Sequence, residues 1–515
     1  MSTIRRRFVR VGERWVHLRH AGSGPAVLLL HQSPQNSAMW EPLMRAWSAH
    51  FTLIAPDTPY FGHSDPLPSR EPSIGDLAEA TSALADAIGL QRFAVMGMHT
   101  GGLIAAELAS RDPRRVACLV VDGYAAFSPE ETARYGHDYL PPFEPAWDGS
   151  HLRWLWARVR EQKYFFPWYD GRAQAAMAIA PHGTAATHAA AMDVLEVGDA
   201  YRIGYGAAFR HVAHDGLARL QPPSWLLYHR NDPLSAHRAR LPELPPHVQC
   251  ELLADAAALE QRAGEILRHA LAGEPDAAPS WAEGRDAAGW TRELRRTPVG
   301  DVACWRRAGS LPLRVVLHAP ATRPLVPEAI GGDDAALAID LPGHGASSPF
   351  PGALDRATIV EAVLGALEVE PGDAPILLEA HGASAGYVPA LASRLGPRLR
   401  DVALREPWAL DPAQRACLLS ALPQLAPQRA GGHLDEAWQW ERERHLLRPW
   451  MPPSAAARVL TDAPEPADVH ANVVELLRIG PQLRALFEGA LPTTLAAHDG
   501  HALTPPPIPE EAHSR

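Results

Sequence analysis

A histidine stands where the sequence predicts its sharpest turn. The segment VMGMHTGG, residues 95–102, follows a short apolar run and precedes LIAAELAS, which has helical spacing. A strand, a Gly-x-X-x-Gly turn and a helix together form a nucleophile elbow, in which X is usually serine. Here X is His99, whose imidazole can act as a general base for water or for a substrate proton, or can attack a substrate directly. The glycines around the turn relieve crowding at its tip, so the elbow shape is predicted to persist.

A second short motif carries a serine. GASAG, residues 382–386, satisfies Gly-x-Ser-x-Gly, follows PILLEAH and precedes a helical stretch. A serine hydroxyl needs a neighbouring base to become a good nucleophile. The histidines nearest the end of the chain, His501 and His513, are badly spaced for that role. Ser384 is therefore predicted to lack its base.

The two motifs belong to a longer internal similarity. AVLLLHQSP resembles RVVLHAP, LIAPDTPYFGHSDP resembles LAIDLPGHGASSP, and VMGMHTGGLIAAELASR resembles EAHGASAGYVPALASR, in one order and at a nearly constant offset. In the third match His99 pairs with Ser384. The pattern predicts a tandem duplication, with one copy over residues 1–275, a linker rich in Ala, Gly, Pro and acidic residues over 276–289, and a shorter copy over 290–515.

The elements that position these motifs follow from the apolar runs. AVLLLH, FTLIAPD, FAVMGM and VACLVVDG are nearly continuous apolar runs, which is typical of buried parallel strands, and SIGDLAEATSALADAIG and LIAAELASR have helical spacing. This alternation predicts an α/β fold with two domains, each a mostly parallel, doubly wound sheet. Each domain is expected to carry a helical cap, at about 125–220 and about 407–490, and the second domain is expected to be truncated.

Composition limits the possible functions. The chain has 515 residues, 46% of them hydrophobic, and a net charge of −11 without any concentrated basic stretch, so nucleic-acid binding has little support. The start lacks the apolar core of a secretory signal, and no apolar run is long enough for a membrane span. Four scattered cysteines show neither metal-ligand spacing nor a disulfide pattern. We expect a cytoplasmic protein with no cofactor and no metal, which acts on a small molecule.

With these motifs in place, residues 1–275 resemble the α/β-hydrolase superfamily, in particular the branch of epoxide hydrolases, haloalkane dehalogenases and carbon–carbon bond hydrolases. The resemblance is carried by HQSP at 31–34, DTPYFGHSD at 57–65, the elbow, and YHRNDPL at 228–234. Residues 290–500 resemble the same family less fully. Single-domain members often pair, so the resemblance also implies a homo-oligomer or an internal pseudo-dimer.

The resemblance implies roles for particular residues. The family has an acid after strand six or seven and a histidine after strand eight. Asp232 matches the acid, whereas Ala258 is the nearest equivalent of the missing histidine. An imidazole on the elbow could then reach Asp232 across the vacant position and form a dyad with His99 as base or nucleophile. The oxyanion hole would come from the amides of Gln32 and Thr100.

The cap contains a stretch rich in aromatic residues, HLRWLWARVREQKYFFPWYDGR at 151–172, called the aromatic run below. Part of this run is expected to line the substrate pocket. The predicted pocket residues are Trp154, Tyr164, Phe165 and Trp168, together with His31 at the start of the oxyanion loop. Three basic residues are interleaved with the aromatic residues of this stretch: Arg158, Arg160 and Lys163. An inward-pointing basic side chain would favour an aromatic or apolar acid or ester as substrate.

These observations favour a hydrolase of a small ester, lactone, epoxide or C–C bond, with His99 oriented by Asp232. Three alternatives stay open: a non-catalytic pseudoenzyme or scaffold, a cofactor-free lyase or decarboxylase, and a serine hydrolase that uses Ser384. In the last case Asp499, in HDGHALTP, would be the acid of the second copy.

Overall fold

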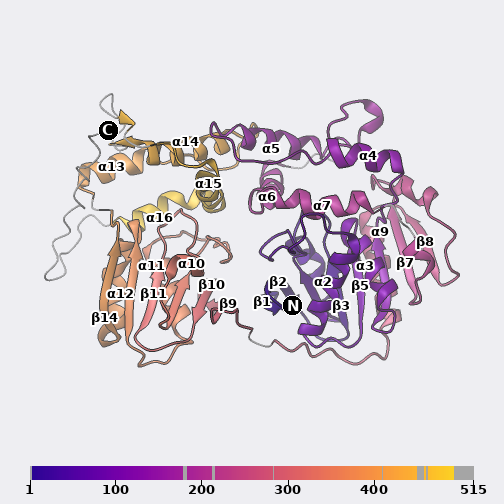
Figure 1. Cartoon of the computed structure of the whole chain (residues 1–515), viewed down its shortest axis with the longest axis horizontal. Helices are drawn as coiled ribbons and strands as arrows, with labels where there is room; N and C mark the ends of the chain where they lie inside the picture. The colour runs from indigo at the N-terminus through magenta and orange to yellow at the C-terminus, as the bar shows by residue number, and fades with distance from the viewer. Residues whose placement is uncertain are drawn as a thin grey trace. The chain divides into compact units, whose positions relative to one another are not determined.

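The chain divides into two compact units in its computed structural model (Figure 1). The structure describes residues 3–177, 183–211, 215–281, 284–408, 410–448, 458–459 and 462–491. Unit 1 comprises Met1–Ala146 and Ser150–Asp286, and unit 2 comprises Trp147–Gly149 and Ala287–Arg515. Within the described ranges, no helix has the length and apolar character needed to cross a membrane.

Unit 1 is built on an eight-stranded sheet. Its strands are β1 (Arg5–Val11), β2 (Arg14–Ala21), β3 (Ala26–Leu30), β4 (Thr52–Pro56), β5 (Phe93–Met98), β6 (Val116–Asp122), β7 (Ser224–His229) and β8 (Val248–Leu253). They are ordered β1-β2-β4-β3-β5-β6-β7-β8, and every pairing from β4 to β8 is parallel. The nearly continuous apolar runs form β3, β4 and β6, which are buried along their whole length. The predicted doubly wound, mostly parallel sheet is confirmed.

Helices flank this sheet and fill one long insertion. The helices outside the insertion are α1 (Glu41–Trp47), α2 (Ile74–Ala87), α3 (Thr100–Arg111) and α9 (Ala256–Ala270). Between β6 and β7 lie α4 (Pro129–Asp138), α5 (Ser150–Glu161), α6 (Thr184–Leu195), α7 (Ala200–Arg210) and α8 (Asp215–Ala218). In Figure 1, α6 and α7 lie beyond one end of the unit-1 strands. This is where the sequence predicts a cap, and α4 to α8 are called the insertion helices below.

Unit 2 contains a six-stranded sheet with a related order. Its strands are β9 (Trp290–Thr297), β10 (Gly300–Arg307), β11 (Leu313–Leu317), β12 (Ala336–Ile339), β13 (Ile376–His381) and β14 (Leu399–Arg405). The order β9-β10-β12-β11-β13-β14 repeats that of the first six strands of unit 1. The helices are α10 (Pro327–Ile330), α11 (Arg356–Leu367), α12 (Val388–Leu395), α13 (Pro412–Ser420), α14 (Gly432–Leu446), α15 (Pro466–Ile479) and α16 (Leu483–Ala490). Among the described residues this sheet ends at β14, and the duplication itself stays a prediction.

One loop has the same internal support in both units. His31 follows β3, lies with Nδ1 3.0 Å from the carbonyl of the next residue, and accepts the Thr58 amide through Nε2 at 2.9 Å. His318 follows β11 and repeats both contacts, at 2.8 Å to the next carbonyl and at 3.0 Å from the Leu341 amide. Both rings are buried, at 1% and 2% exposure, so both side chains hold adjacent loops together.

Candidate active site

The turn after β5 is a strained elbow with His99 at its tip. β5 ends at Met98, α3 begins at Thr100, and His99 between them has φ 47° and ψ −109°. This left-handed backbone is rare for a residue with a side chain, and such strain concentrates at functional sites. A Cβ on Gly97 would lie 2.1 Å from the carbonyl oxygen of Gly101, so only glycine fits beside the tip. The glycines of the motif thus permit the turn that presents the imidazole.

His99 and Asp232 meet, although 133 residues separate them. The Nε2 atom of His99 lies 3.2 Å from Oδ2 of Asp232, which is buried to 3% exposure. The other carboxylate oxygen accepts the Leu234 amide at 2.7 Å, which holds the carboxylate in place. The imidazole is 20% exposed, and among the described residues its Nδ1 atom has no hydrogen-bond partner. One ring nitrogen is therefore oriented by an acid while the other is free to take a proton.

Close packing against Gly123 fixes this contact. Gly123 follows β6 with φ 71°, and a Cβ there would lie 2.5 Å from Oδ2 of Asp232 and 2.6 Å from Cδ2 of His99. The backbone of Gly123 thus forms a wall against both partners. A side chain at this position would force them apart.

The charges of the pair support each other. Burial alone lowers the pKa of His99, but the Asp232 charge and hydrogen bond, with Asp122 adding to them, raise it above its ordinary value. Burial raises the pKa of Asp232, yet the charge and hydrogen bond of His99 and the Leu234 amide bring it below its ordinary value. The imidazole is therefore a stronger base than a free histidine.

Asp122 is a second acid at the site, one that the sequence motifs did not predict. It is the last residue of β6, and its backbone carbonyl accepts the His99 amide at 2.9 Å. Its side chain is 9% exposed, and Oδ1 is buried without a partner. Burial, together with the Asp232 charge and against the opposing effect of His99, raises the pKa of Asp122 to about 7. The available signal was its place at the end of VACLVVDG, one of the two positions where the family carries an acid.

Three side chains at this edge could offer ligand atoms to a metal. One atom each from Asp122, His229 and Asp232 lie within 4.8 Å of one another. Both oxygens of Asp232 already accept hydrogen bonds, from His99 and from Leu234. A metal ion here would compete with these two hydrogen bonds. The absence of a metal stays a prediction, and Asp122, His229 and Asp232 are the residues to substitute in a metal-binding test.

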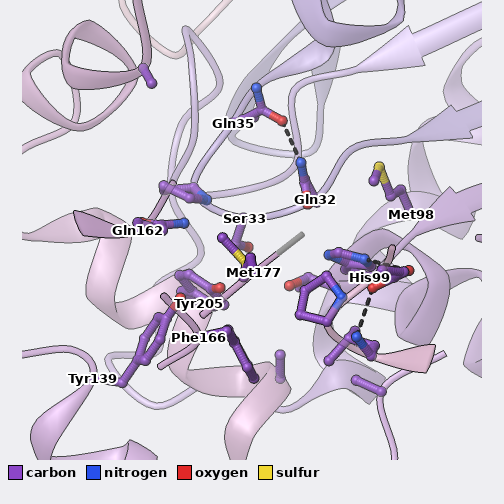
Figure 2. Close-up of a pocket in the computed structure, with 18 of the residues that line it drawn as sticks. Gln32, Ser33, Gln35, Met98, His99, Tyr139, Gln162, Phe166, Met177 and Tyr205 are labelled. Carbon is purple, nitrogen blue, oxygen red and sulfur yellow. Dashed lines mark hydrogen bonds and ion pairs between the residues drawn. The ribbon is translucent and has the colours of Figure 1, made fainter. Parts of the chain in front are cut away.

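The free side of His99 faces a cavity of about 220 Å³ in unit 1. Figure 2 shows His99 on one side of this cavity and Tyr139, Gln162 and Phe166 on the other. Gln32, Thr100 and Asp232 also line it, so the residues expected to form the dyad and the oxyanion hole surround one space. Residues from the insertion helices and the segments beside them supply most of the opposite wall: Phe127, Tyr139, Arg158, Gln162, Phe166, Met177, Tyr205 and Phe209.

The predicted pocket residues of the aromatic run require correction. None of Trp154, Tyr164, Phe165 and Trp168 lines this cavity, and neither does His31. Trp154 stacks on Phe143, the Trp168 indole donates to the Tyr139 carbonyl at 2.9 Å, and Tyr164 is 38% exposed. Trp154 and Trp168 thus pack within the insertion, and His31 holds its loop. Of the aromatic residues in the run, only Phe166 faces the cavity.

The serine motif of unit 2 forms a different turn. β13 ends at His381, and the residue with positive φ directly after it is Gly382, at 54°, so Gly382 rather than Ser384 corresponds to His99. Ser384 lies in a 3-10 helix, Gly382–Tyr387, is fully buried, and donates its hydroxyl to the His318 carbonyl at 2.6 Å. The pairing of His99 with Ser384 was therefore two residues out of register. Asp499 lies outside the described residues.

The fold of unit 1 agrees with comparisons to known proteins. Residues 25–259 match the family model described as alpha/beta hydrolase fold. A pimeloyl-[acyl-carrier protein] methyl ester esterase of Nitrosomonas europaea is 32% identical over 106 residues, which is 21% of this chain and 40% of that protein. A putative carbamate hydrolase of Agrobacterium fabrum is 32% identical over 106 residues, or 21% of this chain and 41% of its own length. The matched stretch thus spans less than half of each of these relatives.

A solved structure is similar over a longer stretch but at lower identity. Potato (Solanum tuberosum) epoxide hydrolase I covers 52% of this chain and 98% of its own, at 22% identity and a TM-score of 0.41.

Proposed function

Residues 25–259 belong to the alpha/beta hydrolase fold family, and from this premise we propose that unit 1 is a hydrolase in which His99 is the catalytic base and Asp232 orients it. The observation that carries the proposal is the hydrogen bond between His99 and Asp232 at the tip of the elbow, with Nδ1 free beside a cavity. The substrate class is a small ester or lactone, with an epoxide or an activated C–C bond as the wider range.

The proposed reaction begins with water. Nδ1 of His99 accepts a proton from a water molecule as the water oxygen bonds to the carbonyl carbon of the substrate. The negative charge on Asp232 stabilises the imidazolium that forms. The same imidazolium then returns the proton to the leaving oxygen as the carbon–oxygen bond breaks. Atoms and charge balance without a cofactor.

The developing oxyanion needs hydrogen-bond donors. Thr100 is the first residue of α3, where helical amides have no partner within the helix, and Gln32 lies in the loop after β3. Both line the cavity together with His99. We assign their amides to the oxyanion hole, as the elbow geometry requires.

A substrate screen with matched variants tests this function. Full-length protein is assayed on nitrophenyl esters and small lactones as wild type, His99→Ala and Ser384→Ala. We expect His99→Ala to lose about 10²–10⁴-fold in kcat/KM and Ser384→Ala to keep wild-type activity, since a positioned base contributes a factor of that size. Activity that survives His99→Ala and disappears in Ser384→Ala would move the site to unit 2. A folded protein without activity on any substrate would favour the scaffold alternative.

Mass spectrometry distinguishes His99 as a base from His99 as a nucleophile. If His99 attacked the substrate directly, an acyl-imidazole would form on the protein. We expect no acyl adduct on the peptide containing His99 when turnover is quenched in acid and the protein is examined by mass spectrometry. An adduct on His99 would replace the base by a nucleophile in the same site.

Unit 2 is proposed as a copy without catalytic activity, which takes the place that a second subunit has in paired single-domain relatives. We further propose a cytoplasmic location, supported by four cysteines without a disulfide pattern. Cell fractionation tests it, and recovery in the membrane or secreted fraction would contradict it.

A further inference from the structure

Arg158 is a buried cation in the wall of the cavity. It lies in α5 at 1% exposure and is among the residues that line the cavity. No carboxylate of the described residues comes within 4.0 Å of its guanidinium nitrogens. The guanidinium group of arginine is a cation with five N–H donors and no acceptor. Burying a charge without a group of opposite charge beside it is energetically unfavourable, so a buried arginine without a carboxylate partner needs an explanation.

The guanidinium has one edge satisfied and one edge free. Nη1 donates to Oε1 of Gln162 at 3.0 Å, whereas Nε and Nη2 are buried without a hydrogen-bond partner. Nε and Nη2 form one edge of the planar group and point two N–H donors in the same direction. That edge matches the two oxygens of a carboxylate, which arginine binds through two parallel hydrogen bonds.

Aromatic rings hold the cation without supplying an acceptor for that edge. The guanidinium carbon lies 5.8 Å from the Tyr139 ring, 5.7 Å from Trp168 and 5.3 Å from Tyr201. Ring faces stabilise a cation electrostatically and fix its plane. They leave the in-plane N–H donors of that edge without an acceptor among the described residues.

The cation and the base lie at different ends of the cavity. Gln162, which Arg158 bonds, and Tyr139, whose ring it contacts, lie across the cavity from His99 (Figure 2). Phe127, Phe166 and Phe209 line the cavity as well. A ligand with an acid at one end, an apolar body and a reacting group at the other end fits this arrangement.

We propose that the substrate is a monocarboxylate, whose acid group binds the Nε and Nη2 edge of Arg158 while its scissile bond lies beside His99. This inference rests on the proposed function for the reacting end. The binding of the acid group depends on Arg158 alone.

Binding measurements test the proposal without any turnover. Isothermal titration of the full chain with phenylacetate, and with its neutral amide as control, is compared in wild type, Arg158→Met and Arg160→Met. Arg160 lies on the same helix but does not line the cavity. We expect phenylacetate to bind wild type and Arg160→Met alike and to bind Arg158→Met about 10–100-fold more weakly, because a charge-assisted pair is lost. The amide should bind all three proteins weakly.

Two further variants keep the test decisive. Arg158→Lys retains the charge but not the two-donor edge, so it should bind phenylacetate more weakly than wild type even if Arg158→Met does not fold. Ser384→Ala, a buried position of unit 2, should bind phenylacetate as wild type does. Because binding needs no turnover, failure of this site is distinguishable from failure of the proposed base. Equal affinity in wild type and Arg158→Lys, equal affinity for acid and amide, or binding of inorganic phosphate in place of the carboxylate would overturn the proposal.

Discussion

The two units handle the turn after their fifth strand in opposite ways. In unit 1 the strained position holds His99 at φ 47°, and the imidazole reaches an acid and a cavity. In unit 2 the equivalent position holds Gly382 at φ 54°, a backbone angle that glycine adopts without strain. The nearby Ser384 is fully buried. A strained side chain at the tip is kept where it has a partner, and a glycine stands where it has none. The difference supports the proposed role of His99.

The largest effect should come from removing the acid that distinguishes unit 1. Asp232→Asn should lower kcat/KM about 10²–10⁴-fold while the protein stays folded, since the amide neither orients the right tautomer nor stabilises the imidazolium. In wild type, kcat/KM should fall as pH drops through the His99 pKa, which is raised above its usual 6.5. Loss of the carboxylate should move this acid limb to lower pH. A pH–rate profile measures both, and an unmoved limb would contradict the dyad.

A smaller loss in kcat/KM should follow from a methyl group placed against His99 and Asp232. Gly123→Ala places a methyl group within 2.6 Å of both His99 and Asp232, and we expect about a 10²-fold loss in kcat/KM because the dyad is displaced. Gly198→Ala is the matched control, since Gly198 also has positive φ, 56°, but nothing within 4 Å of a new Cβ. Comparable losses in both variants would show that backbone strain, not the dyad, is at fault.

The backbone strain at position 99 should lower the free energy of unfolding by a measurable amount. His99→Gly and His99→Ala both remove the imidazole, but only glycine relieves the positive φ. We expect the glycine variant to be about 1 kcal/mol more stable toward denaturant than the alanine variant. In unit 2, Gly382→Ala should show the reverse, a loss of about 1 kcal/mol. Equal stability of the two His99 variants would mean that the elbow is not strained.

The smallest expected effect concerns Asp122. Its pKa is about 7 in the fold and near 3.8 when unfolded, so folding takes up a proton between these values and the folded state loses stability as pH rises from about 4 to 7. Asp122→Asn removes that penalty. The variant should therefore raise the Tm more at pH 8 than at pH 4, by thermal unfolding at both values. A gain of equal size at both pH values would show that Asp122 is not protonated in the fold.

The sequence predicted the elbow and its acid better than the residues that line the opposite side of the cavity. Apolar runs located β3 to β6, and the turn residues located the elbow, because these features are local. Asp232 was found from its motif. The opposite wall combines Phe127, Arg158 and Phe209 from separate segments, and which side of an insertion helix faces the cavity depends on packing that no local pattern records. The Gly-x-Ser-x-Gly motif predicted the wrong equivalent of His99, because residue identity alone aligned Ser384 with it. The end of β13 at His381 instead makes Gly382 the equivalent residue.

The second sheet ends, among the described residues, at β14, and this has a consequence for solubility. β6, at the corresponding place in unit 1, is buried throughout and pairs on both sides, whereas the only described strand that pairs with β14 is β13. An open strand edge is a template for pairing with other chains and hence for aggregation. β14 reads LRDVALR and exposes Arg400, Asp401 and Arg405, charges that discourage such pairing. Replacing these residues with valine or threonine would turn this edge into a site of self-association.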